Sequence, residues 1–113
     1  MREAMIALPI ADNFGAPTAA AHDYLESQLL ASFGGFSVAT GSGVWRDGNQ
    51  VYRDEFRAYT IASEPEPGGE TDARVAMLAH NAAVLAGQLA VYWRDFNGTV
   101  HIDRLDGREV SHD

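Results

Sequence analysis

The chain has 113 residues, with 16 acidic and eight basic side chains, a net charge of −8 and no cysteine. This length predicts a single domain over residues 1–113, and the lack of cysteine excludes disulfides and cysteine-based zinc sites. Phosphate backbones repel so acidic a chain, so we expect no direct binding of nucleic acid. No apolar run approaches the roughly 20 residues that cross a bilayer. We therefore expect a cytoplasmic protein without membrane contact.

The first two predicted elements are a strand and a helix. Residues 4–10 alternate their side chains with the period of a strand. After a turn, residues 17–33 have the period of a helix, and Gly34 is suited to end it. The apolar face of this helix holds Ala21, Leu25, Leu29 and Phe33.

The glycine-rich stretch that follows could be a phosphate-binding loop or a hairpin. A dinucleotide fingerprint requires glycine where the chain has Arg46, and a Walker loop requires a lysine, which the chain lacks. We therefore predict two strands, from about Phe36 to Trp45 and from Val51 to Ala62, joined by a turn at Asp47-Gly48. Gly41 and Gly43 predict a bulge or a sharp bend in the first of them.

The second half of the chain predicts a helix and a closing hairpin. Residues 64–69 form an exposed loop, and Thr71 is suited to cap a helix that ends near Gly87. The apolar stripe of this helix holds Val75, Leu78, Ala82 and Leu85. Residues 89–94 and 99–105 pair around Asn97-Gly98, and residues 106–113 form a frayed tail.

The order of these elements is β-α-β-β-α-β with one extra C-terminal strand. This order predicts an α+β fold, a ferredoxin-like split βαβ sandwich. Right-handed crossovers place both helices on one face of the antiparallel sheet and leave the other face open.

Two stretches resemble a family of small bacterial and phage proteins of unknown function. These stretches are Gly-Val-Trp-Arg-Asp-Gly at 43–48 and Gly-Gln-Leu-Ala-Val at 87–91. In that family a G-x-W-R-x-x-x-G hairpin and a later G-Q-x-x-V strand start recur. The resemblance, over residues 33–102, implies a ferredoxin-like sandwich and leaves the function open.

Histidines offer two candidate metal or acid–base pairs. His22 and Glu26 lie one helical turn apart, a spacing that can chelate a metal, although a solvated helix face accounts for them as well. His101 and Asp103 point to the same side of the last strand, where they form a metal pair, a base with its orienting carboxylate, or an exposed strand face. Neither pair has a third ligand, so we assign no metal, cofactor or catalytic residue.

Aromatic and charged residues gather instead on the central hairpin. Aromatic residues and arginine are enriched where binding energy concentrates in interfaces. The candidate binding residues are Trp45, Tyr52, Arg53, Asp54, Arg57, Tyr59 and Trp93.

We interpret the sequence as that of a non-enzymatic, acidic interaction protein. Its partner would be another protein or a second copy of itself, and it would act as an oligomer or as an inhibitor, such as an anti-defence factor of a phage or mobile element. One alternative is a small-ligand binder with a pocket on the open sheet face, lined by Tyr52, Tyr59 and Trp93. Another is a small enzyme of the dimeric α+β barrel kind that uses His101 and Asp103.

Overall fold

The computed structural model describes residues 1–12, 14–64 and 66–105. The expected frayed tail, 106–113, lies outside the described residues. In chain order the elements are β1 (Arg2–Pro9), α1 (Ala19–Phe33), β2 (Ser37–Asp47), β3 (Gln50–Ser63), the short 3-10 helix η1 (Pro67–Gly69), α2 (Glu70–Leu85), β4 (Ala90–Arg94) and β5 (Val100–Arg104). Within the described part of the chain, no helix is long and apolar enough to cross a membrane.

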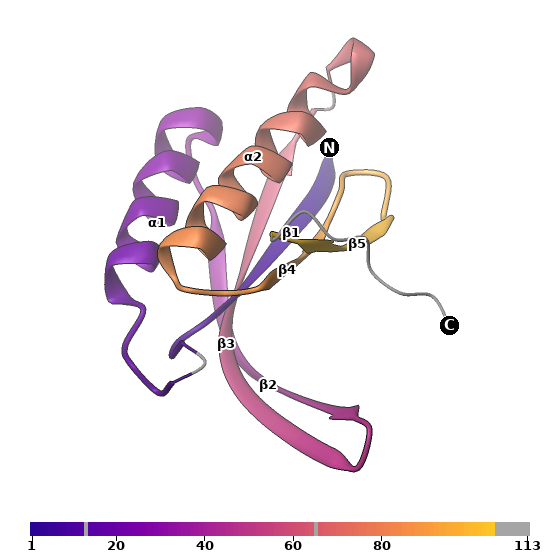
Figure 1. Cartoon of the computed structure of the whole chain (residues 1–113). Helices are drawn as coiled ribbons and strands as arrows, with labels where there is room; N and C mark the ends of the chain where they lie inside the picture. Colours follow the sequence, from indigo (N-terminus) through magenta and orange to yellow (C-terminus); the bar gives the residue numbers. More distant parts are fainter. Residues whose placement is uncertain (13, 65, 106–113) are drawn as a thin grey trace.

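The strands form one sheet in the order β2-β3-β1-β4-β5, and every neighbouring pair is antiparallel. Both helices cover the same face of the sheet (Figure 1). The first four strands thus have the order of a ferredoxin-like sandwich, and β5 is the extra strand at the edge. The predicted fold class is confirmed.

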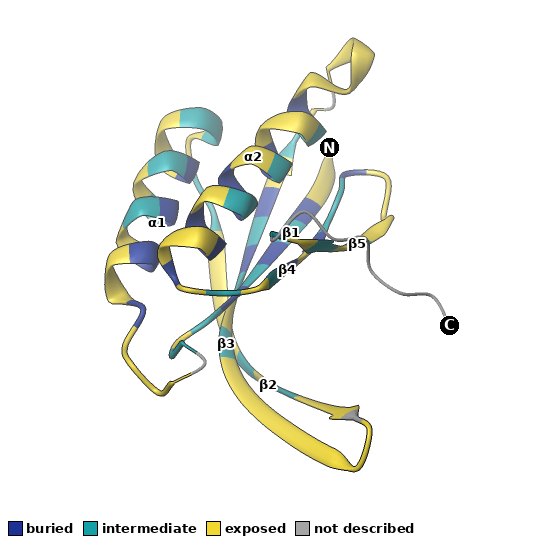
Figure 2. Ribbon diagram, viewed as in Figure 1, coloured by how far each residue is buried: buried dark blue, intermediate teal, exposed yellow. Residues whose placement is uncertain are grey.

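The core lies between the helices and the sheet. Alternation along β1 and β3 directs Ile6, Leu8, Tyr59 and Ile61 toward the helices, where they are fully buried. From the helices, Leu25 and its neighbours on α1 and the small residues of α2 close this layer. Figure 2 shows the buried residues concentrated in this part of the molecule.

The predicted C-terminal end of α1 is right, whereas its predicted start at residue 17 and the predicted N-cap of α2 are each two residues off. Gly34 adopts a left-handed conformation and donates its N–H to the Leu30 carbonyl, which ends α1 as expected. In contrast, Gly69 occupies the N-cap of α2, and Thr71 lies buried inside the helix. The Thr71 hydroxyl accepts the backbone N–H of Glu66 instead, so it holds the preceding loop rather than capping the helix.

The β2–β3 hairpin extends beyond the helices and curves away from them (Figure 1). Its pairing register is continuous from Ser37–Thr60 to Asp47–Gln50, so the predicted bulge is absent. The glycines serve a different purpose. A Cβ at Gly41 would lie 2.8 Å from the ring of Phe56, and one at Gly43 would lie 2.6 Å from the ring of Trp45. Both glycines therefore make room for aromatic rings on the open face of the hairpin.

Candidate functional site

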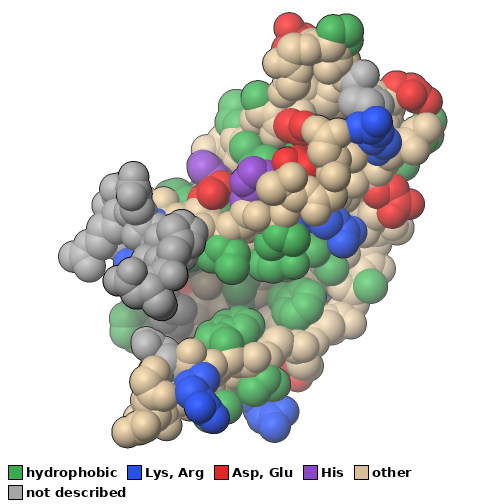
Figure 3. Space-filling view, turned by 90° about the vertical axis from the view of Figure 1, so that its right-hand side faces the viewer, with side chains coloured by type: hydrophobic (Ala, Val, Ile, Leu, Met, Phe, Trp, Pro, Cys, Tyr) green, Lys and Arg blue, Asp and Glu red, His purple; other side chains and the backbone are tan. Residues whose placement is uncertain are grey.

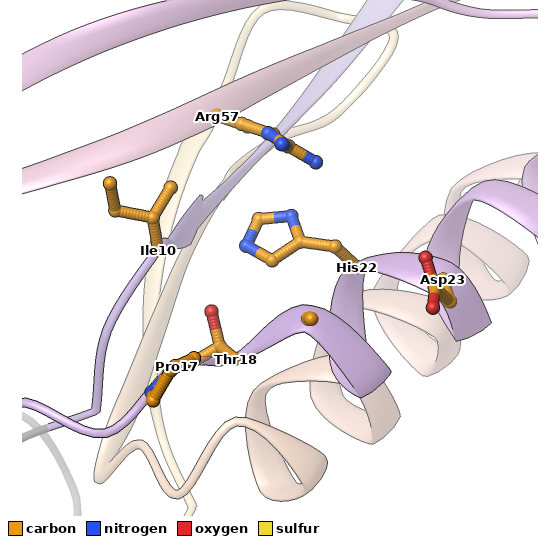
Figure 4. A pocket seen from close by; sticks show the side chains of 7 residues that line it. Ile10, Pro17, Thr18, His22, Asp23 and Arg57 are labelled. Atoms are coloured by element: carbon orange, nitrogen blue, oxygen red, sulfur yellow. The ribbon is translucent and has the colours of Figure 1, made fainter.

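A pocket of about 230 Å³ opens where the end of β1, the first turns of α1 and the middle of β3 meet. Figure 4 shows the imidazole of His22 within it and the Arg57 side chain extending from β3 toward that ring. The residues that line the pocket are Ile10, Pro17, Thr18, Ala19, His22, Asp23 and Arg57.

A chain of polar contacts runs beneath this pocket from β1 to β3. His22 Nε2 lies 2.9 Å from the carbonyl oxygen of Pro9, and His22 Nδ1 lies 2.7 Å from the hydroxyl of Tyr59. The Tyr59 hydroxyl donates to Glu26 Oε2 at 2.8 Å, and Arg57 Nη1 lies 3.5 Å from the same oxygen. The contacts join three elements at one point, so the pocket walls are held by polar groups as well as by packing.

Local sequence patterns explain why these side chains meet. His22 lies three and seven residues before Leu25 and Leu29, so it belongs to the stripe of α1 that faces the sheet. On β3, the buried Tyr59 alternates with half-buried neighbours and lies two residues from the buried Ile61. A helix stripe and a strand face that are both directed inward therefore bring the imidazole and the phenol together.

Burial is the largest cause of the shifted pKa values of His22 and Tyr59 in this chain of contacts. His22 is 3% exposed, and burial lowers the pKa of its imidazole. The charge of Arg57 acts in the same direction, whereas the Pro9 hydrogen bond and the charges of Glu26 and Asp23 oppose it. Burial, followed by the hydrogen bond to Glu26, raises the pKa of Tyr59 to about 12. The phenol therefore keeps its proton throughout the physiological range.

A larger hollow of about 340 Å³ lies on the outer surface, lined by Tyr24 of α1 and by Asn81, Val84 and Leu85 of α2. Its lining holds no carboxylate, imidazole or guanidinium group. The pocket at His22 combines such groups with burial, and buried ionisable groups are concentrated at functional sites. For that reason we regard the smaller pocket as the candidate site.

The predicted binding residues do not form one patch. Trp45 and Tyr52 pair directly across the hairpin and are about half exposed. Asp54 is exposed on the same side of β3 as Tyr52, while Arg53 points to the opposite side together with Arg57. Only Arg57 and Tyr59 among the seven candidates belong to the pocket region.

Two members of the pocket expected on the open sheet face lie on the other face. Tyr59 and Trp93 are both paired with Ile6 of β1 and are buried under the helices, whereas Tyr52 lies on the open side of the hairpin. These three side chains therefore cannot line a common pocket. The prediction failed because Tyr52 and Tyr59 are an odd number of residues apart on an unbroken strand.

The pair His101 and Asp103 is likewise separated into two contacts. Asp103 accepts hydrogen bonds from Trp93 Nε1 at 2.7 Å and His80 Nε2 at 2.8 Å. His101 Nε2 instead lies 2.9 Å from Asp95, and its ring stacks on Trp93. Among the described residues, no group of three or more side chains could hold a metal ion.

From the sequence alone, His22 and Glu26 are either a pair of metal ligands or part of a solvated helix face. His22 is buried, so a solvated face does not describe it. The signal that could have identified it is its place on the apolar stripe of the helix, where an ionisable side chain needs a buried partner. Nothing in the linear sequence identified that partner as Tyr59, which lies 37 residues away.

No family model matches the sequence, and no curated protein is significantly similar to it. Two solved structures share its fold, namely a phage SAM lyase in complex with S-methyl-5'-thioadenosine and a phage SAM lyase in the apo state. Each superposes with a TM-score of 0.71 at 14% sequence identity. The matches cover 95% of this chain and 92% and 91% of those chains.

This similarity overturns the interpretation of the chain as a non-enzymatic interaction protein or inhibitor. The proteins that share its fold over nearly their whole length are enzymes. The interpretation relied on the absence of familiar catalytic motifs, but a fold can carry chemistry without any short signature.

Proposed function

We propose that the chain is an enzyme that binds S-adenosylmethionine (SAM) and cleaves it, releasing S-methyl-5'-thioadenosine. The observation that carries this proposal is the fold shared with the phage SAM lyase over nearly the full length of both chains. The net charge of −8 also supports it, because SAM carries a net positive charge and an acidic protein attracts a cationic ligand.

The reaction places few demands on acid–base groups. The bond between the sulfonium sulfur and the four-carbon amino-acid chain breaks, and its electron pair moves to sulfur, which leaves as a neutral thioether. The substrate's own carboxylate attacks the carbon that loses the sulfur, so a C–O bond replaces the broken C–S bond and the amino-acid fragment leaves as a lactone. Neither water nor an oxidant enters. The protein's task is therefore to orient the amino-acid end of the substrate and to desolvate the sulfonium.

The pocket at His22 suits the amino-acid end of SAM. Its volume of about 230 Å³ is below the 300 to 1,000 Å³ usual for a whole drug-sized ligand, so part of the substrate would lie outside it. Arg57 is half exposed and makes one long ion pair, which leaves N–H groups free for the substrate carboxylate. Asp23 supplies a negative charge for the ammonium group.

Chromatography of SAM incubated with the purified chain tests the proposal directly. We expect S-methyl-5'-thioadenosine to accumulate with time and enzyme concentration. Replacing Arg57 with alanine should weaken SAM binding about tenfold or more, the cost of losing a hydrogen bond to a charged group. The matched control is Arg74→Ala, which removes an exposed arginine from α2. An absence of the thioether product, or equal losses in both variants, would contradict the proposal.

A further inference from the structure

The segment that joins β1 to α1 carries the most exposed large hydrophobic side chain among the residues that the structure describes. This side chain is Phe14, which is 96% exposed, ahead of Met1 at 85%. A single exposed apolar residue is common on protein surfaces and by itself indicates no function. Phe14 stands out because of its position, since the segment that carries it also forms part of the rim of the pocket at His22.

Asp12 holds the backbone around Phe14 in a tight turn. The Asp12 carboxylate accepts the backbone N–H groups of Phe14 and Ala16, each at 2.8 Å. The backbone N–H of Asp12 also donates to the Ala16 carbonyl at 2.7 Å, and its carbonyl accepts from Gly15 at 3.0 Å. Gly15 has a φ of 84°, which glycine adopts without strain. These hydrogen bonds hold the Phe14 backbone in place while its ring remains in solvent.

Both ends of this turn lead into the wall of the pocket. Ile10 precedes the turn, Pro17 follows it, and both residues line the pocket. In Figure 4, Ile10 and Pro17 lie on one side of the His22 imidazole, and Asp23 lies on the other side. The rim is therefore apolar where it meets the turn. Phe14 is three residues from Pro17, so their Cα atoms are at most about 11 Å apart.

This division of the rim favours one orientation of a ligand that has a charged end and a purine. In the proposed function, Arg57 and Asp23 bind the carboxylate and the ammonium group of SAM. The pocket of about 230 Å³ does not hold the whole molecule, so the nucleoside extends across the rim. The apolar side at Ile10 and Pro17 favours the purine ring, because removing apolar surface from water is favourable.

We propose that the Phe14 ring packs against the purine of the bound nucleoside and strengthens its binding. This inference rests on the proposed function, which supplies the identity of the ligand. An aromatic side chain stacked on a nucleobase strengthens binding about fivefold to 150-fold. The turn at Asp12 adds to this gain, because a side chain on a held backbone loses little freedom when the ligand arrives.

Phe14→Ala and Phe14→Tyr are the informative pair of variants, because the first removes the ring and the second keeps it. Phe14 is 96% exposed, so both variants should fold like the wild type. Calorimetry with S-methyl-5'-thioadenosine and with adenosine measures the binding of the purine nucleoside. Phe14→Ala should weaken the binding of both probes at least fivefold, whereas Phe14→Tyr should retain it. The matched control is Met77→Ala, which removes an exposed apolar side chain from α2 and should leave both affinities unchanged.

Nuclear magnetic resonance tests the contact itself. In the complex with S-methyl-5'-thioadenosine, we expect nuclear Overhauser effects between the purine protons H2 or H8 and the ring protons of Phe14. The Phe14→Tyr variant assigns these ring signals. Ring signals of Phe14 that respond to protein concentration, and not to the nucleoside, would overturn the proposal and assign the ring to a contact between copies of the chain.

The binding experiment also separates this inference from the proposed function. Cleavage of SAM together with equal affinities of wild type and Phe14→Ala for S-methyl-5'-thioadenosine would overturn the role of Phe14 alone. An equal loss of affinity in Met77→Ala would overturn it as well. Nucleoside binding that depends on Phe14, without any cleavage of SAM, would support the role of Phe14 and refute the proposed function.

Discussion

Two positions in the β2–β3 hairpin require glycine because an aromatic ring lies over them, not because of their backbone conformation. Gly41 and Gly43 have ordinary φ values, yet a Cβ at either position would contact an aromatic ring. A sequence pattern shows that a strand contains glycine, but it does not show which ring crosses over it. For that reason the sequence predicted the hairpin and its turn correctly, but it could not predict the aromatic rings that these two residues accommodate.

Gly41→Ala should destabilise the protein by about 1 to 2 kcal/mol, because the Phe56 ring must move to admit the methyl group. Gly35→Ala is the matched control, since no atom lies within 4 Å of its Cβ position and its φ is not positive. That variant should be neutral or slightly stabilising. Urea denaturation measures both, and equal stability of the two variants would contradict the role of the Phe56 ring.

Among the elements, the β4–β5 hairpin depends on two ionised carboxylates. Asp95 accepts the backbone N–H groups of Asn97 and Thr99 and lies against His101, while Asp103 accepts from Trp93 and His80. Burial opposes the ionisation of both carboxyl groups, but these hydrogen bonds outweigh it and lower both pKa values. The sequence predicted this hairpin from Asn97-Gly98, but the partners of the carboxylates come from side-chain packing that the turn signal does not encode.

A lowered carboxyl pKa contributes stability that is complete above the unfolded value of about 3.9 and is lost as the pH falls through the folded value. Acid titration of the folded protein should therefore show a loss of stability below about pH 4. Asp103→Asn should reduce this loss and should lower stability at pH 7 by about 1 kcal/mol, a value kept small because the carboxylate is partly exposed. Thermal denaturation measures this stability. If the stability of the variant falls below pH 4 as steeply as that of the wild type, Asp103 does not contribute to the acid loss.

For the molecule as a whole, the ferredoxin-like order followed from alternation, helical period and turn residues, all of which are local. The pocket did not follow from them, because its partners come from residues 9, 22, 26, 57 and 59, which only the folded sheet brings together. The acidity that we interpreted as that of an interaction protein is equally suited to a cationic small molecule. The absence of direct nucleic-acid binding stays a prediction.

The β2–β3 hairpin still predicts self-association. Val44 and Val51 are exposed on one side of the hairpin, and Trp45 and Tyr52 are exposed on the other side. This part of the hairpin therefore has no buried face of its own. Figure 3, in which the right-hand side of Figure 1 faces the viewer, shows hydrophobic side chains around a hollow above the hairpin. Burying such surface against a second copy gains about 25 cal/mol per Å².

We therefore expect a homo-oligomer in light scattering at micromolar concentration. Replacing Trp45 and Tyr52 together with serine should shift it toward the monomer. Met77→Ser, which removes an equally exposed apolar side chain from α2, should not. A monomeric wild type across a range of salt concentrations would refute this expectation.

The stack of Trp93 on His101 also gives the protein two distinguishable optical reporters. Trp93 is buried, with its ring 4.1 Å from the imidazole, whereas Trp45 lies half exposed on the hairpin. A buried indole emits at shorter wavelength than an exposed one. Emission from Trp93 should thus follow the opening of the sheet edge. Emission from Trp45 should follow whatever covers the hairpin, so one spectrum reports on both ends of the molecule.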